Sequence, residues 1–352
     1  MNPQPIEPLP EIVFAREGRL GLVTLNRPGA LNALTHAMAR SLAERLRVWG
    51  DDPAVAAVAI TGAGERAFCA GGDVRDLYDA RLAPDRAFHR EFYRDEYRLN
   101  RRIYRYRKPY VALIDGIVMG GGVGISIHGR FRAVSEKAVF AMPETGIGLF
   151  PDVGGSHFLS RCPGRIGLYL GLSGARLGAA DMVYAGLATH FVPRGEMPIL
   201  RAALASEPPE AALARLARDA GPAPLAALRS AVDRCFAPDK VEDILSALDR
   251  EGGTWAADTA KVIRARSPLA VKVAARQIAH GGSLGLEDCL RMEFRLVQSF
   301  MAGTEFFEGV RALLIDKDQK PRWSPARLED VSDAMVEACF APPAAEELTF
   351  DD

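Results

Sequence analysis

Cysteine is scarce in this chain of 352 residues, and the five cysteines present form no recognisable pattern. They are Cys69, Cys162, Cys235, Cys289 and Cys339, and no two of them are spaced as C-x-x-C. An odd, unpatterned set predicts a reducing compartment and argues against both a disulfide framework and a structural zinc site. The histidines show no metal-ligand spacing either, so we expect no bound metal.

The sequence also lacks long apolar runs and any recognisable targeting segment. No apolar stretch approaches the length of a membrane span, so no membrane partner is expected. The first ten residues are rich in proline and lack an apolar core flanked by basic residues. They also lack the Arg and Ser of a transit peptide. These features predict a soluble, cytoplasmic protein.

An excess of either charge is missing as well. The 44 Lys and Arg nearly cancel the 45 Asp and Glu, which leaves a formal charge of −1. This balance gives no reason to expect nucleic acid as a partner, and an anionic ligand would have to meet a local basic patch. Apolar residues make up 48% of the chain and charged residues 25%, as in ordinary globular proteins.

Hydrophobic periodicity divides the chain into two parts. Strands are predicted at residues 12–16, 20–25, 55–61 and 109–114, and helices at 35–49 and 84–105. The alternation of strands and helices to about residue 192 predicts an α/β fold. Ala-rich and Leu-rich segments with helical spacing follow. We therefore expect a core over 11–200, a helical C-terminal region over 201–335, and tails at 1–10 and 336–352.

Two Gly-rich turns follow predicted buried strands. Gly71 and Gly72 end the first, within Phe-Cys-Ala-Gly-Gly-Asp, and Gly120, Gly121 and Gly122 open a helix after the second. Glycines let backbone N–H groups approach a ligand closely, and two such groups aimed at one point form an oxyanion hole. The alternative is that these glycines only permit tight turns, and short glycine patterns alone do not decide between the two.

Two carboxylates, Glu144 and Asp152, lie eight positions apart in a segment rich in Gly, Pro and apolar residues. Apolar surroundings raise the pKa of a carboxylic acid and suit it to proton transfer near neutral pH. The alternative is structural, with Glu144 starting a helix and Asp152 capping the next one.

The motifs in order resemble those of the crotonase (enoyl-CoA hydratase/isomerase) superfamily. They are Asn-Arg-Pro at 26–28 with Ala-Leu-Asn-Ala-Leu at 30–34, Phe-Cys-Ala-Gly-Gly-Asp at 68–73, the glycines at 120–122, and Pro-Glu at 143–144. Four further stretches resemble its thioester-hydrolase branch. These are Glu-Tyr with Leu-Asn between 96 and 100, and the segments 142–155, 291–295 and 308–323. The resemblance covers about residues 12 to 325.

The resemblance implies a spiral of ββα units, with a helical C-terminal region, that binds an acyl-coenzyme A. It implies hydrolysis of a short branched β-hydroxyacyl-CoA thioester. Coenzyme A would belong to the substrate, with no other cofactor, and the resemblance allows a homo-oligomer. The implied oxyanion-hole donors are the N–H groups of Gly72 and Gly121. Glu144 and Asp152 match the catalytic carboxylates, and Glu96 matches an acid that contacts the substrate.

The same resemblance implies a set of coenzyme A-binding positions. These are Arg27, Ala30, Ala70 and Asp73.

Two residues depart from the hydratase pattern. Hydratases place a second glutamate on the helix after the Gly triplet, where this chain has Gly124, and usually carry glycine where it has Asp152. Hydration needs two acids holding one water, so the moved carboxylate fits attack at a carbonyl better. Glu144 would either activate a water or attack the carbonyl to give a mixed anhydride. The alternatives are a hydratase or isomerase, and a non-catalytic acyl-CoA-binding protein.

Three other features favour structural explanations. Arg94, Arg98, Arg101 and Arg105 recur at helical spacing, and a charged surface helix explains them better than a contact with coenzyme A phosphates. Cys69 lies beside the first Gly-rich turn, but no histidine is placed to activate it, so it is expected to pack in the core. The Gly triplet also lacks the third glycine of a dinucleotide loop.

Overall fold

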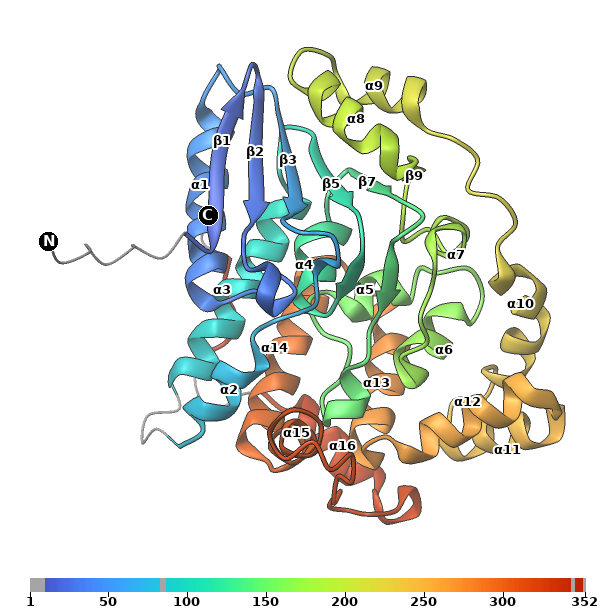
Figure 1. Ribbon diagram of the computed structural model, residues 1–352. Coiled ribbons are helices and arrows are strands. Elements are labelled where there is room, and N and C mark those ends of the chain that lie inside the picture. Colours follow the sequence, from blue (N-terminus) through green and yellow to red (C-terminus); the bar gives the residue numbers. More distant parts are fainter. Residues whose placement is uncertain (1–9, 83–86, 343–345, 351–352) are drawn as a thin grey trace, which may run out of the picture.

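The computed structural model describes residues 10–82, 87–342 and 346–350. Within these ranges two sheets carry all the strands (Figure 1), a six-stranded sheet in the order β1-β2-β3-β5-β7-β9 and a three-stranded sheet in the order β4-β6-β8. The strands are β1 (Ile12–Glu17), β2 (Leu20–Leu25), β3 (Ala57–Gly62), β4 (Ala67–Cys69), β5 (Tyr110–Ile114), β6 (Ile117–Met119), β7 (Phe131–Val134), β8 (Val139–Ala141) and β9 (His190–Phe191). The predicted α/β class is confirmed.

The chain winds as a spiral in which each turn gives one strand to each sheet. β3, β5 and β7 enter the large sheet, and each is followed directly by its partner β4, β6 or β8 in the small sheet. All these neighbours pair in parallel. Parallel neighbours need a long crossover, which the helices supply. The ends of β4, β6 and β8 therefore come together, and the Gly-rich turns and Glu144 follow those ends.

Both faces of the large sheet are buried, which explains the continuous apolar runs of its strands. Val58 and Ile60 of β3 belong to the main core, against helix α1 (His36–Asp51), and Ala57 and Ala59 pack on the other face. Helices α8 (Met197–Leu204) and α9 (Pro209–Leu216) cover that second face (Figure 1).

The other helices pack around the two sheets and below them in the view of Figure 1. Those of the first 200 residues are α2 (Val74–Ala80), α3 (Ala87–Tyr104), α4 (Gly121–Ile127), α5 (Gly155–Leu159), α6 (Ile166–Ser173) and α7 (Ala179–Tyr184). Those that follow α9 are α10 (Pro224–Cys235), α11 (Val241–Glu251), α12 (Gly253–Ala265), α13 (Pro268–Gly281), α14 (Leu286–Ala302), α15 (Glu305–Val310) and α16 (Asp333–Phe340). The predicted helix 84–105 begins among residues that the structure does not describe, and its described part is α3.

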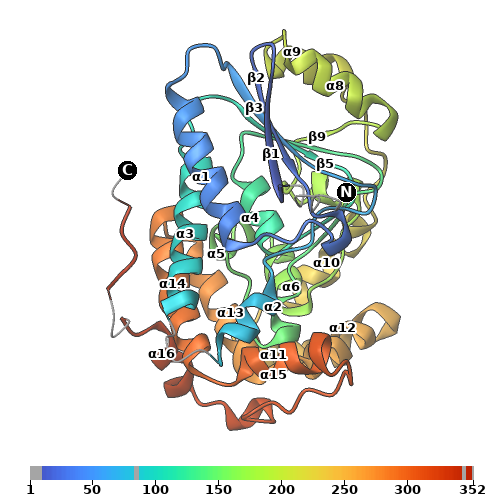
Figure 2. The same ribbon diagram turned by 60° about the vertical axis from the view of Figure 1, so that its left-hand side comes forward.

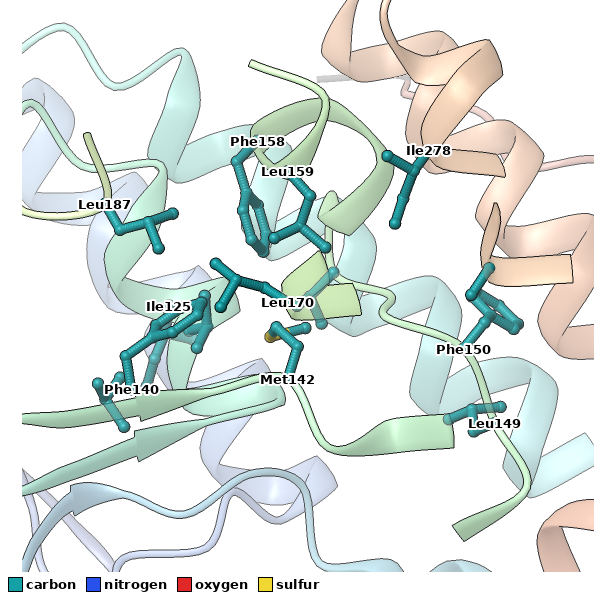
Figure 3. Packing of buried hydrophobic residues seen from close by; sticks show 14 of the residues in the cluster. Ile125, Phe140, Met142, Leu149, Phe150, Phe158, Leu159, Leu170, Leu187 and Ile278 are labelled. Carbon is teal, nitrogen blue, oxygen red and sulfur yellow. The ribbon is translucent and has the colours of Figure 1, made fainter. Parts of the chain in front are cut away.

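The C-terminal helices return to the core. Helix α14 lies beside α3, and α13 packs against α5 and α6 (Figure 2). Figure 3 shows the result inside the molecule, where Ile278 of α13 faces the same apolar cluster as Phe158 and Leu170. The predicted boundary near residue 200 stays a prediction, but one hydrophobic core includes residues from both sides of it.

The arginines on the charged face of α3 form hydrogen bonds with the C-terminal part of the chain. Arg101 and Arg105 both bond to Glu287 of α14, and Arg98 bonds to Thr349 near the C-terminus. Among the described residues no helix is long and apolar enough to span a membrane, and no group of three or more His, Cys, Asp or Glu is placed to hold a metal ion.

Candidate active site

The two Gly-rich turns lie side by side because the strands that lead into them pair in parallel. β4 pairs with β6 through Ala67↔Ile117 and Cys69↔Val118, so the chain leaves both strands at the same edge. A Cβ built on Gly121 would lie 3.1 Å from the backbone nitrogen of Gly72. The two predicted oxyanion-hole residues are therefore neighbours.

The backbone around Gly72 leaves its N–H without a hydrogen-bond acceptor among the described residues. Gly71 O accepts from Leu34 N at 2.8 Å, and Asp73 N donates to Leu34 O at 2.9 Å. The Gly72 N–H between them points away from Leu34. Gly121 is the first residue of α4, and the first N–H groups of a helix have no acceptor within the helix. In the part of the chain that the structure describes, no acceptor is recorded for either N–H. The pair can donate to one carbonyl oxygen.

Glu144 follows β8 and opens a short 3₁₀ helix, Glu144–Ile147. Its side chain is only 5% exposed, and a Cβ built on Gly120 would lie 3.2 Å from its Oε1. Oε2 has no hydrogen-bond partner among the described residues. Burial, reinforced by the charge of Asp152, raises the pKa of Glu144 well above its usual range. Glu144 is therefore a buried, unengaged carboxyl group beside the Gly triplet.

Asp152 shares this buried space. It is 5% exposed and accepts a hydrogen bond from the Tyr97 hydroxyl at 2.9 Å. Burial raises the pKa of Asp152 to about 7, and the Tyr97 bond acts in the opposite direction. Figure 3 shows Leu149 and Phe150, which belong to the segment between the two acids, as part of the buried apolar cluster.

Glu96 of α3 completes a set of three acids. It is 2% exposed, its Oε1 lacks a partner among the described residues, and a Cβ on Gly121 would lie 2.6 Å from that oxygen. Burial and the charge of Asp152 raise the pKa of Glu96 well above its usual range. Three neighbouring acids with raised pKa values hold at least one proton between them near pH 7. The site therefore offers both a proton donor and a proton acceptor.

The structure explains why position 124 holds glycine. A Cβ built there would lie 2.7 Å from Cβ of Val153, and 2.9 Å from Nδ2 of Asn100. The space that a hydratase glutamate would need is filled. Val153 itself has φ of 53°, a left-handed conformation that is a clear outlier for a β-branched residue and costs about 1–2 kcal/mol.

The predicted coenzyme A-binding residues lie together but are largely engaged. Arg27 binds Asp73 (3.0 Å), Glu11 (2.9 Å) and the carbonyl of Ala33 (2.7 Å). Two of the predicted positions take part through the backbone alone. Ala30 ends the short 3₁₀ helix Pro28–Ala30, and Ala70 N donates to Leu31 O at 3.0 Å. Arg27 thus ties the first loop to the Gly72 turn, and direct contact with coenzyme A stays a prediction.

Cys69 is fully buried, and burial raises the pKa of its thiol to about 12. A thiol that stays protonated is a poor nucleophile. Packing therefore explains this residue.

Sequence reasoning assigned no role to several residues that the structure brings to the site. Tyr97 holds Asp152, and the buried amide of Asn100 has no partner for either of its polar atoms among the described residues. Both belong to the stretch 96–100 that carried the resemblance. The charge of Arg266, in the α12–α13 turn, acts to lower the pKa of Glu144 against the larger effect of burial. Nothing local to Arg266 indicates this interaction, because the partner lies more than a hundred residues away.

Comparison with known proteins shows the family to which the chain belongs. The family model described as enoyl-CoA hydratase/isomerase matches residues 20–340. A protein of Gallus gallus described as "3-hydroxyisobutyryl-CoA hydrolase, mitochondrial" is 44% identical over 94% of this chain and 89% of its own length. The Homo sapiens protein of the same description is 42% identical over 97% and 91%.

Two solved structures share the whole fold. One, titled a carnitinyl-CoA dehydratase from Mycobacterium thermoresistibile, superposes with a TM-score of 0.93 at 45% identity and covers 97% of this chain and 99% of its own. The other, titled an enoyl-CoA hydratase from Rhodobacter sphaeroides 2.4.1, gives 0.92 at 42%, covering 97% and 100%. These likenesses confirm the predicted crotonase spiral.

The comparisons contradict the predicted cytoplasmic location. The curated relatives are described as mitochondrial. The prediction was wrong because it rested on unpaired cysteines and on the character of the first residues. Unpaired cysteines indicate reducing conditions and do not distinguish one reducing compartment from another.

Proposed function

Because this chain belongs to the enoyl-CoA hydratase/isomerase family, we propose that it uses the crotonase spiral to hydrolyse a β-hydroxyacyl-CoA thioester. The substrate is a short branched ester, 3-hydroxyisobutyryl-CoA, which water converts to 3-hydroxyisobutyrate and coenzyme A. The observation that carries the proposal is the pairing of Glu144 and Asp152 beside the free N–H groups of Gly72 and Gly121.

The reaction begins with polarisation of the thioester carbonyl. Its oxygen accepts hydrogen bonds from the Gly72 and Gly121 N–H groups, which stabilise the negative charge that develops when a nucleophile adds to the carbon. One donor of this kind is typically worth about 3–4 kcal/mol of barrier. Both donors are backbone groups held by parallel strands, so no reorganisation is needed when the charge appears.

Glu144 supplies the base or the nucleophile. In one route its carboxylate takes a proton from water, the hydroxide adds to the carbonyl carbon, and the C–S bond breaks. In the other route the carboxylate adds to the carbon itself, expels the thiolate and leaves a mixed anhydride, which water then cleaves. In both routes the thiolate takes up one proton, and in this proposal Asp152 donates it.

The protonation states fit these roles. A raised pKa makes the Glu144 carboxylate a stronger base, although it reduces the fraction ionised at neutral pH. Burial raises the pKa of Asp152 to about 7, so it holds a proton in much of the population at that pH. Thioester hydrolysis is redox-neutral and the N–H pair polarises the carbonyl, so we infer that the reaction needs no metal or redox cofactor.

Glu96 gives the preference for a β-hydroxyacyl group. Its unpartnered Oε1 lies next to Gly121, and so next to the carbonyl-binding position. A buried polar atom without a partner disfavours an acyl chain that offers it none, and a hydroxyl group satisfies it. This substrate would give the enzyme a place in valine catabolism.

A hydratase is the second candidate, because two solved structures that share the fold carry dehydratase and hydratase titles. Hydration would require a second acid where this chain has Gly124, and Val153 occupies that space. The structure therefore favours the hydrolase.

Thiol release from a panel of coenzyme A esters tests the proposal. We expect rapid release from 3-hydroxyisobutyryl-CoA and 3-hydroxypropionyl-CoA, slow release from acetyl-CoA, and loss of at least about a hundredfold in Glu144→Gln. Water addition to crotonyl-CoA without thiol release would establish the hydratase instead. Binding of all the esters without turnover would indicate an acyl-CoA-binding protein.

A further inference from the structure

The segment that carries Asp152 forms hydrogen bonds with Glu293, a residue of α14 far away in the sequence. Its Oε2 accepts from Gly154 N at 2.6 Å, and its Oε1 accepts from Ser156 N at 2.9 Å and from the Ser156 hydroxyl. The side chain is fully buried. A single carboxylate therefore takes three hydrogen bonds from the residues just after Asp152.

Two further side chains bond to the carbonyls on either side of Asp152. Gln277 of α13 donates its Nε2 to Pro151 O at 2.6 Å. His128, at the end of α4, lies with Nε2 2.7 Å from Val153 O. A carbonyl only accepts, so His128 carries its proton on Nε2. Burial lowers the pKa of His128 to about 4, so the ring stays neutral near pH 7.

We propose that Glu293, Gln277 and His128 form a three-point clamp that positions Asp152 for the hydrolytic reaction. This inference rests on the proposed function. None of the three is a catalytic residue, because each bonds to the backbone of the segment 151–156, and Glu293 in addition to the Ser156 hydroxyl, away from the reacting atoms. They act through Asp152, whose carboxylate stays directed toward Tyr97 and Glu144.

The backbone conformation shows what the clamp opposes. Val153 is left-handed at φ 53°, which an unrestrained valine leaves for the extended or right-handed region. The N–H of Val153 belongs to the peptide group that joins it to Asp152, and its C=O belongs to the one that joins it to Gly154. Rotation of the Val153 backbone therefore turns the Asp152 side chain away from its partners. Hydrogen bonds before and after Val153 prevent that rotation.

The cost of burying the carboxyl group of Glu293 favours a positioning role over a role in stability alone. Replacing a buried ionic group by an apolar one of similar volume is often neutral or stabilising, so a buried carboxylate is a poor structural brace. Glu293 also feels the like charge of Asp152, which together with burial raises its pKa to about 8. This placement directs two acceptor oxygens at the backbone of the segment 151–156.

The first test compares Glu293→Gln with wild type. Glutamine keeps the volume of Glu293 but turns an N–H₂ group toward one of the two backbone N–H groups. A displacement of about 1 Å at a reacting group costs roughly a hundredfold in rate. We expect kcat for 3-hydroxyisobutyryl-CoA to fall about a hundredfold in Glu293→Gln, with KM and the Kd of free coenzyme A within about threefold.

Glu305→Gln is the matched control. Glu305 is also a buried carboxylate, and it accepts from Ser324 N at 2.8 Å and from the Ser267 hydroxyl, away from the segment 151–156. We expect it to lower the melting temperature as much as Glu293→Gln while kcat stays within about threefold. Equal losses of kcat in the two variants, or a parallel rise of KM and of the coenzyme A Kd in Glu293→Gln, would overturn the clamp.

A second readout does not depend on turnover. The carboxyl ¹³C signal of Asp152, assigned by its absence in Asp152→Asn, reports the pKa of the group among its titratable neighbours Tyr97, Glu96, Glu144 and Glu293. Release of the clamp exposes Asp152 to water, so its pKa should fall by at least one unit in Gln277→Met, a substitution that removes a hydrogen bond to Pro151 O but no charge. An unchanged pKa would overturn the clamp. Absence of thiol release by the wild type would instead refute the proposed function and leave this titration to decide the inference.

Discussion

A single added methyl group at position 124 tests the geometry that separates this site from that of a hydratase. In Gly124→Ala the new Cβ would lie 2.7 Å from Cβ of Val153, 3.0 Å from its Cγ1 and 2.9 Å from Nδ2 of Asn100. Real Cβ atoms do not approach so closely, so Val153 must move. Overpacking of this kind costs about 1–3 kcal/mol. Because Val153 follows Asp152 directly, we expect thioester hydrolysis to fall together with stability.

A second substitution, at Val153, isolates the free energy of the clash between the new Cβ at position 124 and the Val153 side chain. Val153→Gly removes the left-handed strain of about 1–2 kcal/mol but gives up about 1.5–3 kcal/mol of side-chain burial, so alone it is mildly destabilising. In the double variant Gly124→Ala/Val153→Gly the clash with Val153 is absent, and only the approach to Nδ2 of Asn100 remains. The free energies of unfolding should therefore be non-additive, with a favourable coupling of about 1–3 kcal/mol.

Urea unfolding of the four proteins measures the cycle, and thiol release measures the activity. Gly195→Ala is the control, because no atom lies within 4 Å of a Cβ built there and Gly195 lacks a positive φ. That substitution should change the free energy of unfolding by less than about 1 kcal/mol. If Gly124→Ala were as mild as Gly195→Ala, or if the two effects simply added, Val153 would not occupy the hydratase position and the reasoning would fail.

Three further predictions concern ionisation. Tyr97→Phe removes the hydrogen bond that lowers the pKa of Asp152, so the midpoint of the kcat–pH profile near 7 should move to higher pH, and an unmoved midpoint would contradict the contact. Arg266→Met removes the attraction that lowers the pKa of Glu144, so kcat at pH 7 should fall about tenfold and recover at higher pH, as a pH–rate series would show. Folded Asp152 keeps a proton that the unfolded chain loses above about pH 4, so the free energy of unfolding should decrease as pH rises from 4 to 7. Asp152→Asn should reduce that slope by up to about 1.4 kcal/mol per unit, measured by urea unfolding at pH 5 and 7.

The sequence predicted the parts of the site whose signals are local. Glycines directly after buried strands indicated close backbone approach, and the parallel pairing of β4 with β6 places Gly72 and Gly121 together as expected. Glu144 and Asp152 stood out because carboxylates are unusual in an apolar segment, and both are buried. Their roles as catalytic groups stay a proposal. In each case a few adjacent residues contained the information.

Long-range partners left no such signal. The hydrogen bond from Gly154 N to Glu293 joins residues 139 positions apart. The resemblance implied that Arg27 binds coenzyme A, but its guanidinium forms ion pairs with Asp73 and Glu11 once the loops fold together. Gly124 was recognised as a departure from the hydratase pattern, whereas the reason for it, the side chain of Val153, depends on a contact between α4 and the catalytic segment. Tertiary contacts of this kind follow from the topology, which residue spacing alone does not give.

The helices after residue 200 have a chemical consequence that the spiral alone would not supply. Glu144 and Asp152 gain their raised pKa values chiefly from burial, and burial here depends on α13 and α14 packing against the segment that joins the two acids. Gln277 and Glu293 lie on those same helices and bond to that segment on either side of Asp152. An open spiral would expose the acids to water, return their pKa values toward 4 and let Val153 relax. The C-terminal helices therefore convert a fold that binds acyl-CoA into one that can hold a proton donor and a base next to the same carbonyl.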